Sequence, residues 1–199
     1  MRFLDLDGTI LDLWPRYYSV FCELLRAKNI TLQQYKSKKL CLCRDDAVAA
    51  SFGYVLPADY FIKKAELLED REFLKLDGLY LSGTQIGMLF EGDNTMILTK
   101  RRRLDNLNWQ LRKLGIDLPT VVIEDLTKKQ WIQLNYPVER SEMIGDSIMD
   151  LETGQLPNVL PVMVGYGLGT RKQFDSVKIP YIYIDSPNEL IDYLKTRGI

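Results

Sequence analysis

Residues 3–10, Phe3-Leu4-Asp5-Leu6-Asp7-Gly8-Thr9-Ile10, place two aspartates one residue apart directly after a short apolar run. The run Arg2-Phe3-Leu4 is typical of a buried strand, and Gly8 predicts that the strand stops and the chain turns. Two like charges at a strand end repel each other unless they have separate roles or a counter-ion. The pair therefore raises the question of which positive charge compensates for it.

Five further apolar runs predict the other strands of the same sheet. They are residues 95–98, 120–123, 142–144, 161–164 and 181–184. Helical segments lie between them, such as 104–115, whose apolar residues recur every three or four positions before a terminal glycine, and 188–194 predicts a last helix. This alternation predicts an α/β fold, a Rossmann-like parallel sheet with helices on both faces.

The segment between the first two strands, about residues 13 to 90, is too long for one crossover connection. Two apolar stripes, in residues 17–25 and 60–68, indicate that the inserted chain is helical. We therefore expect a catalytic core over residues 1–12 and 81–199, with a small helical domain over residues 13–80 inserted after the first strand.

Composition excludes several classes of function. The 26 basic and 27 acidic residues nearly balance, so we expect neither nucleic acid nor a membrane surface as partner. No segment approaches the ~20 apolar residues of a membrane span. Cys41 and Cys43 are too close in sequence for an ordinary disulfide, which predicts reduced thiols and a cytoplasmic protein. The chain has no histidine, which excludes serine–histidine and cysteine–histidine catalysis and histidine metal sites.

Polar groups follow four of the predicted strands, at the edge of a parallel sheet where functional groups collect. They are Asp5 and Asp7, Thr99, Lys128 and Lys129, and Gly145-Asp146-Ser147 with Asp150. Carboxylates that converge without compensation oppose folding, and a divalent cation resolves the conflict. Because every available ligand is an oxygen, we expect Mg²⁺, held by carboxylates, waters and a substrate phosphate.

An aspartate beside such an ion can attack phosphorus and form an acyl phosphate. A threonine and a lysine at neighbouring strand ends would then hold the phosphoryl oxygens. The set Asp5-Leu6-Asp7-Gly8-Thr9, Thr99, the lysine and Gly145-Asp146-Ser147 with Asp150 resembles the haloacid dehalogenase superfamily of hydrolases. All four sequence motifs of that superfamily are present in order. The insert resembles the helical cap of the subgroup whose cap follows the first motif.

The resemblance implies a role for each matching residue. Asp5 is the implied nucleophile, and Asp7 the implied general acid and base. The implied Mg²⁺ ligands are Asp5, the backbone carbonyl of Asp7 and Asp146, with Asp150 binding through water or orienting the ligands. The implied phosphate-binding residues are Thr99, Gly8, and Lys128 or Lys129. Members of the superfamily that dehalogenate lack the second aspartate, so Asp7 favours phosphate chemistry.

Three local features of the sequence allow more than one interpretation. Lys128 is favoured over Lys129, because Trp131 and Ile132 then follow at helical spacing on the buried side. The basic run at residues 100–103 follows Thr99, and its position suggests binding of a phosphorylated or carboxylated substrate; a solvated surface, the usual role of such a run, is the favoured interpretation. The glycine-rich stretch at residues 165–169 lacks the lysine of a phosphate loop and is interpreted as a flexible loop bordering the site.

The sequence therefore predicts a magnesium-dependent phosphatase that acts on a small phosphorylated metabolite, with the cap choosing the substrate. The natural substrate and the oligomeric state have no signature in the sequence. A phosphomutase or a phosphonate hydrolase on the same core is the alternative enzyme. A phosphate-binding signalling module without turnover is the alternative from another class, although receiver domains carry their phosphorylated aspartate after the third strand.

Overall fold

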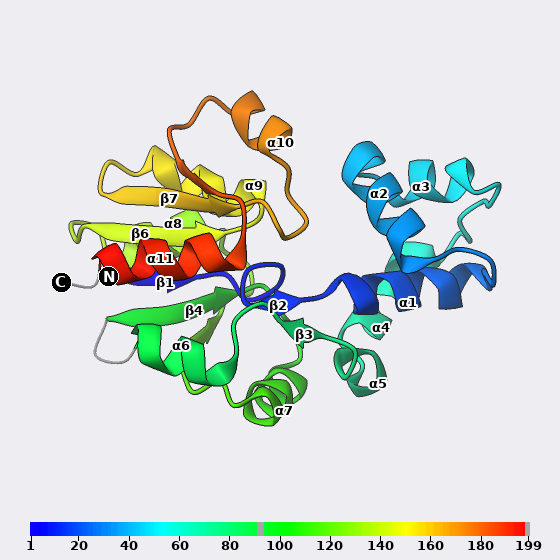
Figure 1. Ribbon diagram of the computed structural model, residues 1–199, viewed down its shortest axis with the longest axis horizontal. Helices are drawn as coiled ribbons and strands as arrows, with labels where there is room; N and C mark the ends of the chain where they lie inside the picture. Colours follow the sequence, from blue (N-terminus) through cyan, green and yellow to red (C-terminus); the bar gives the residue numbers. More distant parts are fainter. Residues whose placement is uncertain (91–93, 198–199) are drawn as a thin grey trace. The chain divides into compact units, whose positions relative to one another are not determined.

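The structure is a computed structural model that describes residues 1–90 and 94–197. The chain divides into two compact units (Figure 1). One comprises residues 1–12 and 79–199 and is called the α/β unit below; the other comprises residues 13–78 and is called the helical unit.

The α/β unit is built on a parallel six-stranded sheet of order β5-β4-β1-β6-β7-β8. Its strands are β1 (Arg2–Leu4), β4 (Thr95–Thr99), β5 (Thr120–Val122), β6 (Ser141–Gly145), β7 (Val159–Val164) and β8 (Ile182–Ile184). The strand that precedes the paired aspartates, β1, lies in the middle of the sheet, between β4 and β6. The predicted Rossmann-like α/β fold is thus confirmed, with each strand within two residues of its expected bounds.

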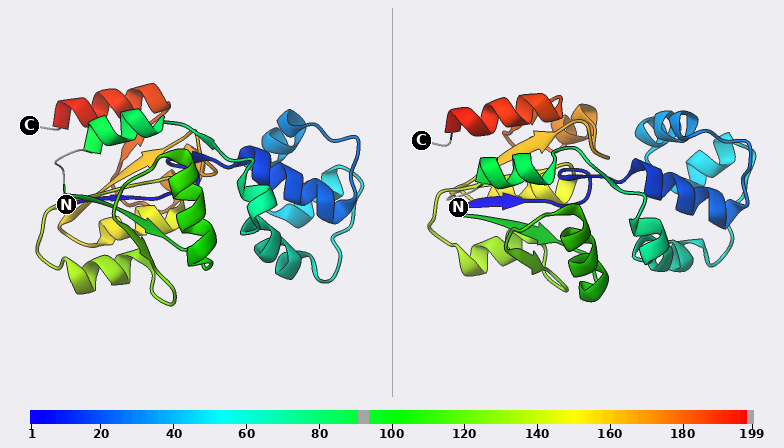
Figure 2. Two further views of the ribbon diagram at one scale, coloured as in Figure 1. Left: turned by 90° about the horizontal axis from the view of Figure 1, so that it is seen from below. Right: turned by 60° about the horizontal axis from the view of Figure 1, so that its bottom comes forward.

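Helices cover both faces of this sheet (Figure 2). One face carries α6 (Gly83–Phe90), α7 (Leu104–Leu114) and α11 (Pro187–Arg197). The other carries α8 (Lys128–Asn135), α9 (Ile148–Leu151), the short 3₁₀ helix η1 (Glu152–Gln155) and α10 (Arg171–Ser176). Successive residues of β1 explain why both faces need cover: Phe3 packs with α8, and Leu4 packs with α7 and α11.

The helical unit contains α1 (Trp14–Leu25), α2 (Leu32–Leu42), α3 (Asp45–Ser51), α4 (Tyr60–Leu68) and α5 (Arg71–Leu74). Its core is aromatic, with the rings of Phe21 and Tyr35 centred 4.9 Å apart. Phe61, expected on the inner stripe of α4, is instead 64% exposed, because Tyr60 occupies the inner side of that helix. None of the described helices has both the length and the apolar character needed to span a bilayer.

Two very short strands were not predicted, β2 (Leu11–Asp12) and β3 (Gly78–Leu79), and they form a separate two-stranded sheet. Just after β3, the backbone N–H of Tyr80 donates to the carbonyl of Ile10 at 2.9 Å. A strand of two residues is too short for a hydrophobic period, so its sequence carries no signal.

Candidate active site

Asp5 lies one residue past β1 at the middle of the sheet. Its backbone N–H donates to the carbonyl of Ile144 at 2.8 Å, which continues the pairing with β6. The side chain is 11% exposed. Three residues after Asp5, Gly8 has φ +88°, a left-handed conformation that favours glycine, and the chain turns away from the strand direction. The neighbouring carboxylates of Asp5 and Asp7 therefore meet different surroundings.

Lys128 places a buried cation on Asp5. Thr127 caps α8 by accepting from the N–H of Gln130, while the Gln130 side chain accepts from the N–H of Thr127, so the helix begins at Lys128. Lys128 Nζ donates to Asp5 Oδ1 at 2.5 Å and to Asp150 Oδ1 at 2.6 Å. Its side chain is 3% exposed.

The adjacent lysine, Lys129, has a different environment. Its Nζ donates to the side-chain oxygen of Gln155 at 2.7 Å, on the surface. Of the two lysines considered from the sequence, the structure thus brings Lys128 to the aspartates and leaves Lys129 outside the group.

Asp146 and Asp150 follow β6 and flank the start of α9. The N–H and the hydroxyl of Ser147 donate to Asp150 Oδ2, at 3.0 and 2.6 Å. Asp146 Oδ2 accepts the backbone N–H of Leu168 at 2.6 Å. Asp5, Asp146 and Asp150 each offer one carboxylate oxygen, and these three oxygens lie within 4.8 Å of one another.

Two glycines leave room for the carboxylate of Asp146. A Cβ atom at Gly8 would lie 2.0 Å from Asp146 Oδ2, and one at Gly167 would lie 2.3 Å from the same oxygen. Both distances are far below van der Waals contact, so each backbone approaches the carboxylate as only glycine allows. The stretch at residues 165–169, expected to border the site, thus also supplies a hydrogen bond and close packing to Asp146.

Burial governs the electrostatics of the cluster. Burial raises the pKa of the Asp5 carboxyl to about 7, opposed by the cation of Lys128 and reinforced by the charge of Asp150. Burial, followed by the charges of Asp5 and Asp150, also raises the pKa of Asp146 well above its usual range. Burial by itself would lower the pKa of Lys128, but the carboxylates of Asp150 and Asp5 outweigh it and raise that pKa.

Thr99 ends β4 beside Asp5, since Leu4 pairs with Ile97 in the sheet. It is 1% exposed, and its hydroxyl accepts the N–H of Arg101 at 3.3 Å.

The side chain of Asp7 is not part of the three-carboxylate group; it pairs with Arg101, whose Nη2 lies 2.5 Å from Asp7 Oδ1. The resemblance implies the backbone carbonyl of Asp7, and not its side chain, as a Mg²⁺ ligand. The ion pair between the Asp7 side chain and Arg101 therefore does not test that prediction.

Arg101 lies in the site, although the sequence favours a solvated surface for the run that contains it. The basic run at residues 100–103 was interpreted as a solvated surface, whereas Arg101 is only 6% exposed. The available signal was its position, two residues after Thr99 at a strand end, together with Gln110, a polar residue inside the apolar stripe of α7. The solvated interpretation is therefore wrong for Arg101.

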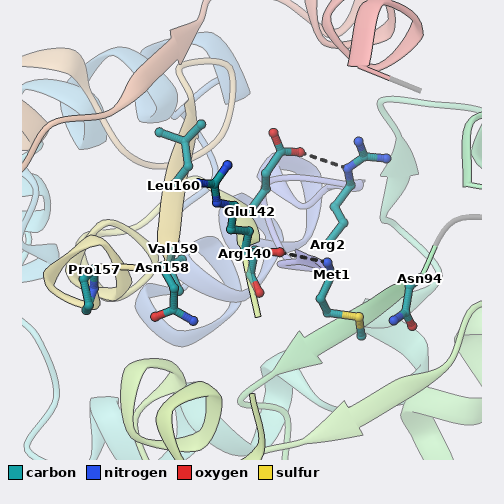
Figure 3. Close-up of a pocket in the computed structure, with 10 residues that line it drawn as sticks. Met1, Arg2, Asn94, Arg140, Glu142, Pro157, Asn158, Val159 and Leu160 are labelled. Carbon is teal, nitrogen blue, oxygen red and sulfur yellow. Dashed lines mark hydrogen bonds and ion pairs between the residues drawn. The ribbon is translucent and has the colours of Figure 1, made fainter. Parts of the chain in front are cut away.

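A separate pocket lies at the opposite, amino-terminal edge of the sheet (Figure 3). Its wall includes Met1, Arg2 and Glu142, with Arg2 Nε 3.2 Å from Glu142 Oε2. None of the residues predicted for the site lines this pocket. Because ligands of open parallel sheets bind at the carboxyl ends of the strands, the candidate site is the aspartate cluster.

Comparison with known proteins bears on the fold. No protein-family model matches the sequence, and no curated protein does either. Solved structures do match over the whole chain. A haloacid dehalogenase family hydrolase from Deinococcus radiodurans R1, solved with bound phosphate and sodium, matches with a TM-score of 0.68 at 16% identity, over 99% of this chain and 95% of that one. The chain has the haloacid dehalogenase fold.

Two further structures support the same conclusion. A haloacid dehalogenase-like hydrolase from Streptococcus pneumoniae has a TM-score of 0.65 at 15% identity, with 96% of each chain covered. A protein described as a predicted phosphoglycolate phosphatase, from Haemophilus somnus 129PT, has a TM-score of 0.67 at 14% identity, over 97% of this chain and 96% of that one. The resemblance read from the four motifs is thus confirmed at the level of the haloacid dehalogenase fold.

Proposed function

We propose that the protein is a magnesium-dependent phosphatase that hydrolyses a small soluble phosphomonoester through an aspartyl phosphate on Asp5. The charge balance of the site carries this proposal. Asp5, Asp146 and Asp150 supply three carboxylates and Lys128 one ammonium, so two negative charges are left, which one divalent cation neutralises. Burial raises the pKa of Asp5 and of Asp146 in spite of Lys128, and a bound cation would favour their ionised forms, which supports a metal at this site.

Mg²⁺ fits the donor set because every available ligand is a hard oxygen. Asp5 and Asp146 would hold it with the backbone carbonyl of Asp7, and Asp150, which already accepts from Ser147 and Lys128, would orient the neighbouring groups. When bound, the ion supplies charge stabilisation to the phosphoryl group in the transition state.

The first half of the proposed reaction transfers the phosphoryl group to the protein. A carboxylate oxygen of Asp5 attacks phosphorus, forming an O–P bond as the bond to the leaving oxygen breaks. Asp7 donates a proton to that leaving oxygen, so the product departs as an alcohol. Lys128 and Thr99 hold the phosphoryl oxygens, and Gly8 lets the backbone approach them.

The second half returns the enzyme to its starting state. Asp7, now a carboxylate, takes a proton from a water molecule, and the water oxygen attacks phosphorus. The bond between phosphorus and the Asp5 oxygen breaks, which releases inorganic phosphate and regenerates the Asp5 carboxylate. The two aspartates of the opening motif thus carry separate roles, one covalent and one in proton transfer.

We further propose that the helical unit is a cap that restricts access to small substrates. Its insertion after the first motif and its five helices support this role. Cys22, Cys41 and Cys43, all within the described residues, form no disulfide, which supports the proposal of a reducing, cytoplasmic location.

The proposed function is tested with a panel of phosphorylated metabolites, including sugar phosphates, glycerol 3-phosphate and phosphoglycolate. We expect inorganic phosphate release from at least one of them with Mg²⁺ and none after chelation with EDTA. Phosphorus NMR of a sugar phosphate reaction would show an isomer if the protein were a mutase. Absence of turnover across the panel, with Mg²⁺ bound, would favour a phosphate-binding module.

Replacement of Gly8 by alanine should weaken Mg²⁺ binding. The new methyl group would meet Asp146 Oδ2 at 2.0 Å and displace that carboxylate. We expect the Kd for Mg²⁺, measured by calorimetry, to rise by about 10-fold or more, the size of effect seen when groups that orient metal ligands are lost.

Gly115→Ala is the matched control, because Gly115 also has a positive φ, +68°, but its Cβ would have no neighbour within 4 Å. Both substitutions carry the backbone strain of about 1–2 kcal/mol, whereas only the change at Gly8 should alter metal affinity. Equal Mg²⁺ affinity in the two variants would argue against the metal site at Asp146.

A further inference from the structure

Arg101 makes three short side-chain hydrogen bonds in the α/β unit. Its Nε donates to Asp7 Oδ2 at 2.8 Å, and its Nη2 donates to Asp7 Oδ1 at 2.5 Å. Its Nη1 donates to the side-chain oxygen of Gln110 at 2.5 Å. The guanidinium therefore donates to both carboxylate oxygens of Asp7 and also to the side chain of Gln110.

The bidentate contact constrains more than charge. Two parallel N–H···O bonds fix both the position of a carboxylate and the orientation of its plane, which a lysine ammonium, as a point charge, cannot do. Arg101 is 6% exposed, and the Asp7 side chain is 26% exposed. The pair thus combines a buried, anchored guanidinium with a carboxylate that is partly exposed.

Gln110 connects this pair to the packed core. It lies on the buried side of α7 between Leu107 and Leu111 and is 1% exposed. A polar side chain in that position carries a desolvation cost unless it is hydrogen-bonded, and its bond to Arg101 meets that need. The position of Asp7 is thereby tied to a helix rather than to the turn at Gly8.

We propose that Arg101 is a positioning residue for Asp7, and that Gln110 positions Arg101 in turn. The inference rests on the phosphatase function proposed above, in which Asp7 moves protons to the leaving oxygen and from water. General acid catalysis requires the proton donor within hydrogen-bond reach of its target, and an error of about 1 Å costs on the order of 100-fold in rate. When Asp7 is protonated, one lone pair of an oxygen carries the proton and the remaining lone pairs still accept from Arg101, so the contact is compatible with proton transfer.

The test compares substrates whose leaving groups differ in their need for a proton. An alkyl phosphate needs a general acid, whereas 4-nitrophenolate leaves as an anion. We expect Arg101→Lys to lower kcat/KM about 100-fold for the best alkyl phosphate of the panel and by less than about 5-fold for 4-nitrophenyl phosphate. The Kd for Mg²⁺, measured by calorimetry, should change by less than about 2-fold, since the three-carboxylate group is untouched.

Gln110→Met provides a second variant that leaves both bonds to Asp7 in place. It should show the same selectivity between the two substrates with a smaller loss, about 10-fold for the alkyl phosphate, and it carries the test if Arg101→Lys does not fold. Arg112→Lys makes the same arginine-to-lysine change as Arg101→Lys, at an exposed position of α7, the helix that carries Gln110. It should leave kcat/KM unchanged for both substrates.

Different outcomes would contradict the positioning role of Arg101 and the proposed phosphatase activity. A similar loss for both substrates, or a rise in KM without a loss of kcat, would overturn the positioning role and indicate a general structural or anion-binding role. Wild-type protein that turns over neither substrate would refute the phosphatase proposal itself, and the inference about Arg101 would fall with it.

Discussion

Lys128→Met is expected to destabilise the metal-free protein by about 3–5 kcal/mol, because it removes the cation from a buried group of carboxylates. Lys128 Nζ lies 2.5 Å from Asp5 and 2.6 Å from Asp150, and the side chain is almost fully buried. The substitution keeps the apolar bulk and removes the buried cation that contacts two of the three carboxylates. Urea denaturation in EDTA measures the change in the free energy of unfolding.

Mg²⁺ should recover part of this loss. The variant site carries one more uncompensated negative charge than the wild-type site, so it attracts a divalent cation more strongly. Because the cation binds the folded state, its binding stabilises the folded protein. The rise in Tm on adding Mg²⁺ should therefore be larger for the variant than for wild type. Phosphatase turnover should still fall by about 100-fold or more, since a group that stabilises phosphoryl charge has been removed.

Lys129→Met is the control for this prediction. The neighbouring lysine bonds only to Gln155 among the contacts described, at the surface, so its loss should change the free energy of unfolding by less than about 0.5 kcal/mol. Equal effects of the two substitutions on stability and turnover would contradict the assignment of Lys128 to the site.

Much of the fold can be predicted from the sequence because the central strands are buried on both faces. Phe3 and Leu4 are both fully apolar and pack against opposite layers of helices, so β1 appears as a continuous apolar run. The same holds for Leu98 and Ile97 in β4. In the helical unit the amphipathic signal is weaker, and the inner face of α4 was misassigned at Phe61.

Some groups of the candidate site can be predicted from the sequence and others cannot. Aspartates, a threonine and a lysine that follow strands can be collected from sequence alone, because parallel strands bring their carboxyl ends to one edge of the sheet. The bond from the N–H of Leu168 to Asp146 leaves no sequence signature, since every residue except proline has that donor. Arg101 was hidden by its basic neighbours, and its partner Asp7 lies 94 positions earlier in the chain.

Asp5→Asn is expected to abolish turnover while preserving the fold. Asparagine has the same shape, and its oxygen can still accept from Lys128, but an amide is not a nucleophile toward phosphorus. We expect phosphate release to fall on the order of 10⁴-fold or more, as when a covalent catalyst is removed from an enzyme.

The change should not weaken the metal-free fold. Burial raises the pKa of Asp5 from an ordinary 3.8 to about 7, so its ionisation opposes folding. The stability that the protonated carboxyl provides is present below about pH 4 and is lost as the pH rises through about 7. Asparagine does not titrate, so at pH 8 in EDTA the variant should unfold at a urea concentration equal to or above that of wild type.

The most direct test of the account is covalent labelling of the protein during turnover. Wild-type protein mixed with ³²P-labelled substrate and Mg²⁺, then quenched in acid, should retain label that hydroxylamine removes, as expected of an acyl phosphate, and peptide mapping should place it on Asp5. Asp5→Asn should retain none. Label on another residue, or Mg²⁺-dependent turnover by Asp5→Asn at the wild-type rate, would contradict the proposal that Asp5 is the nucleophile.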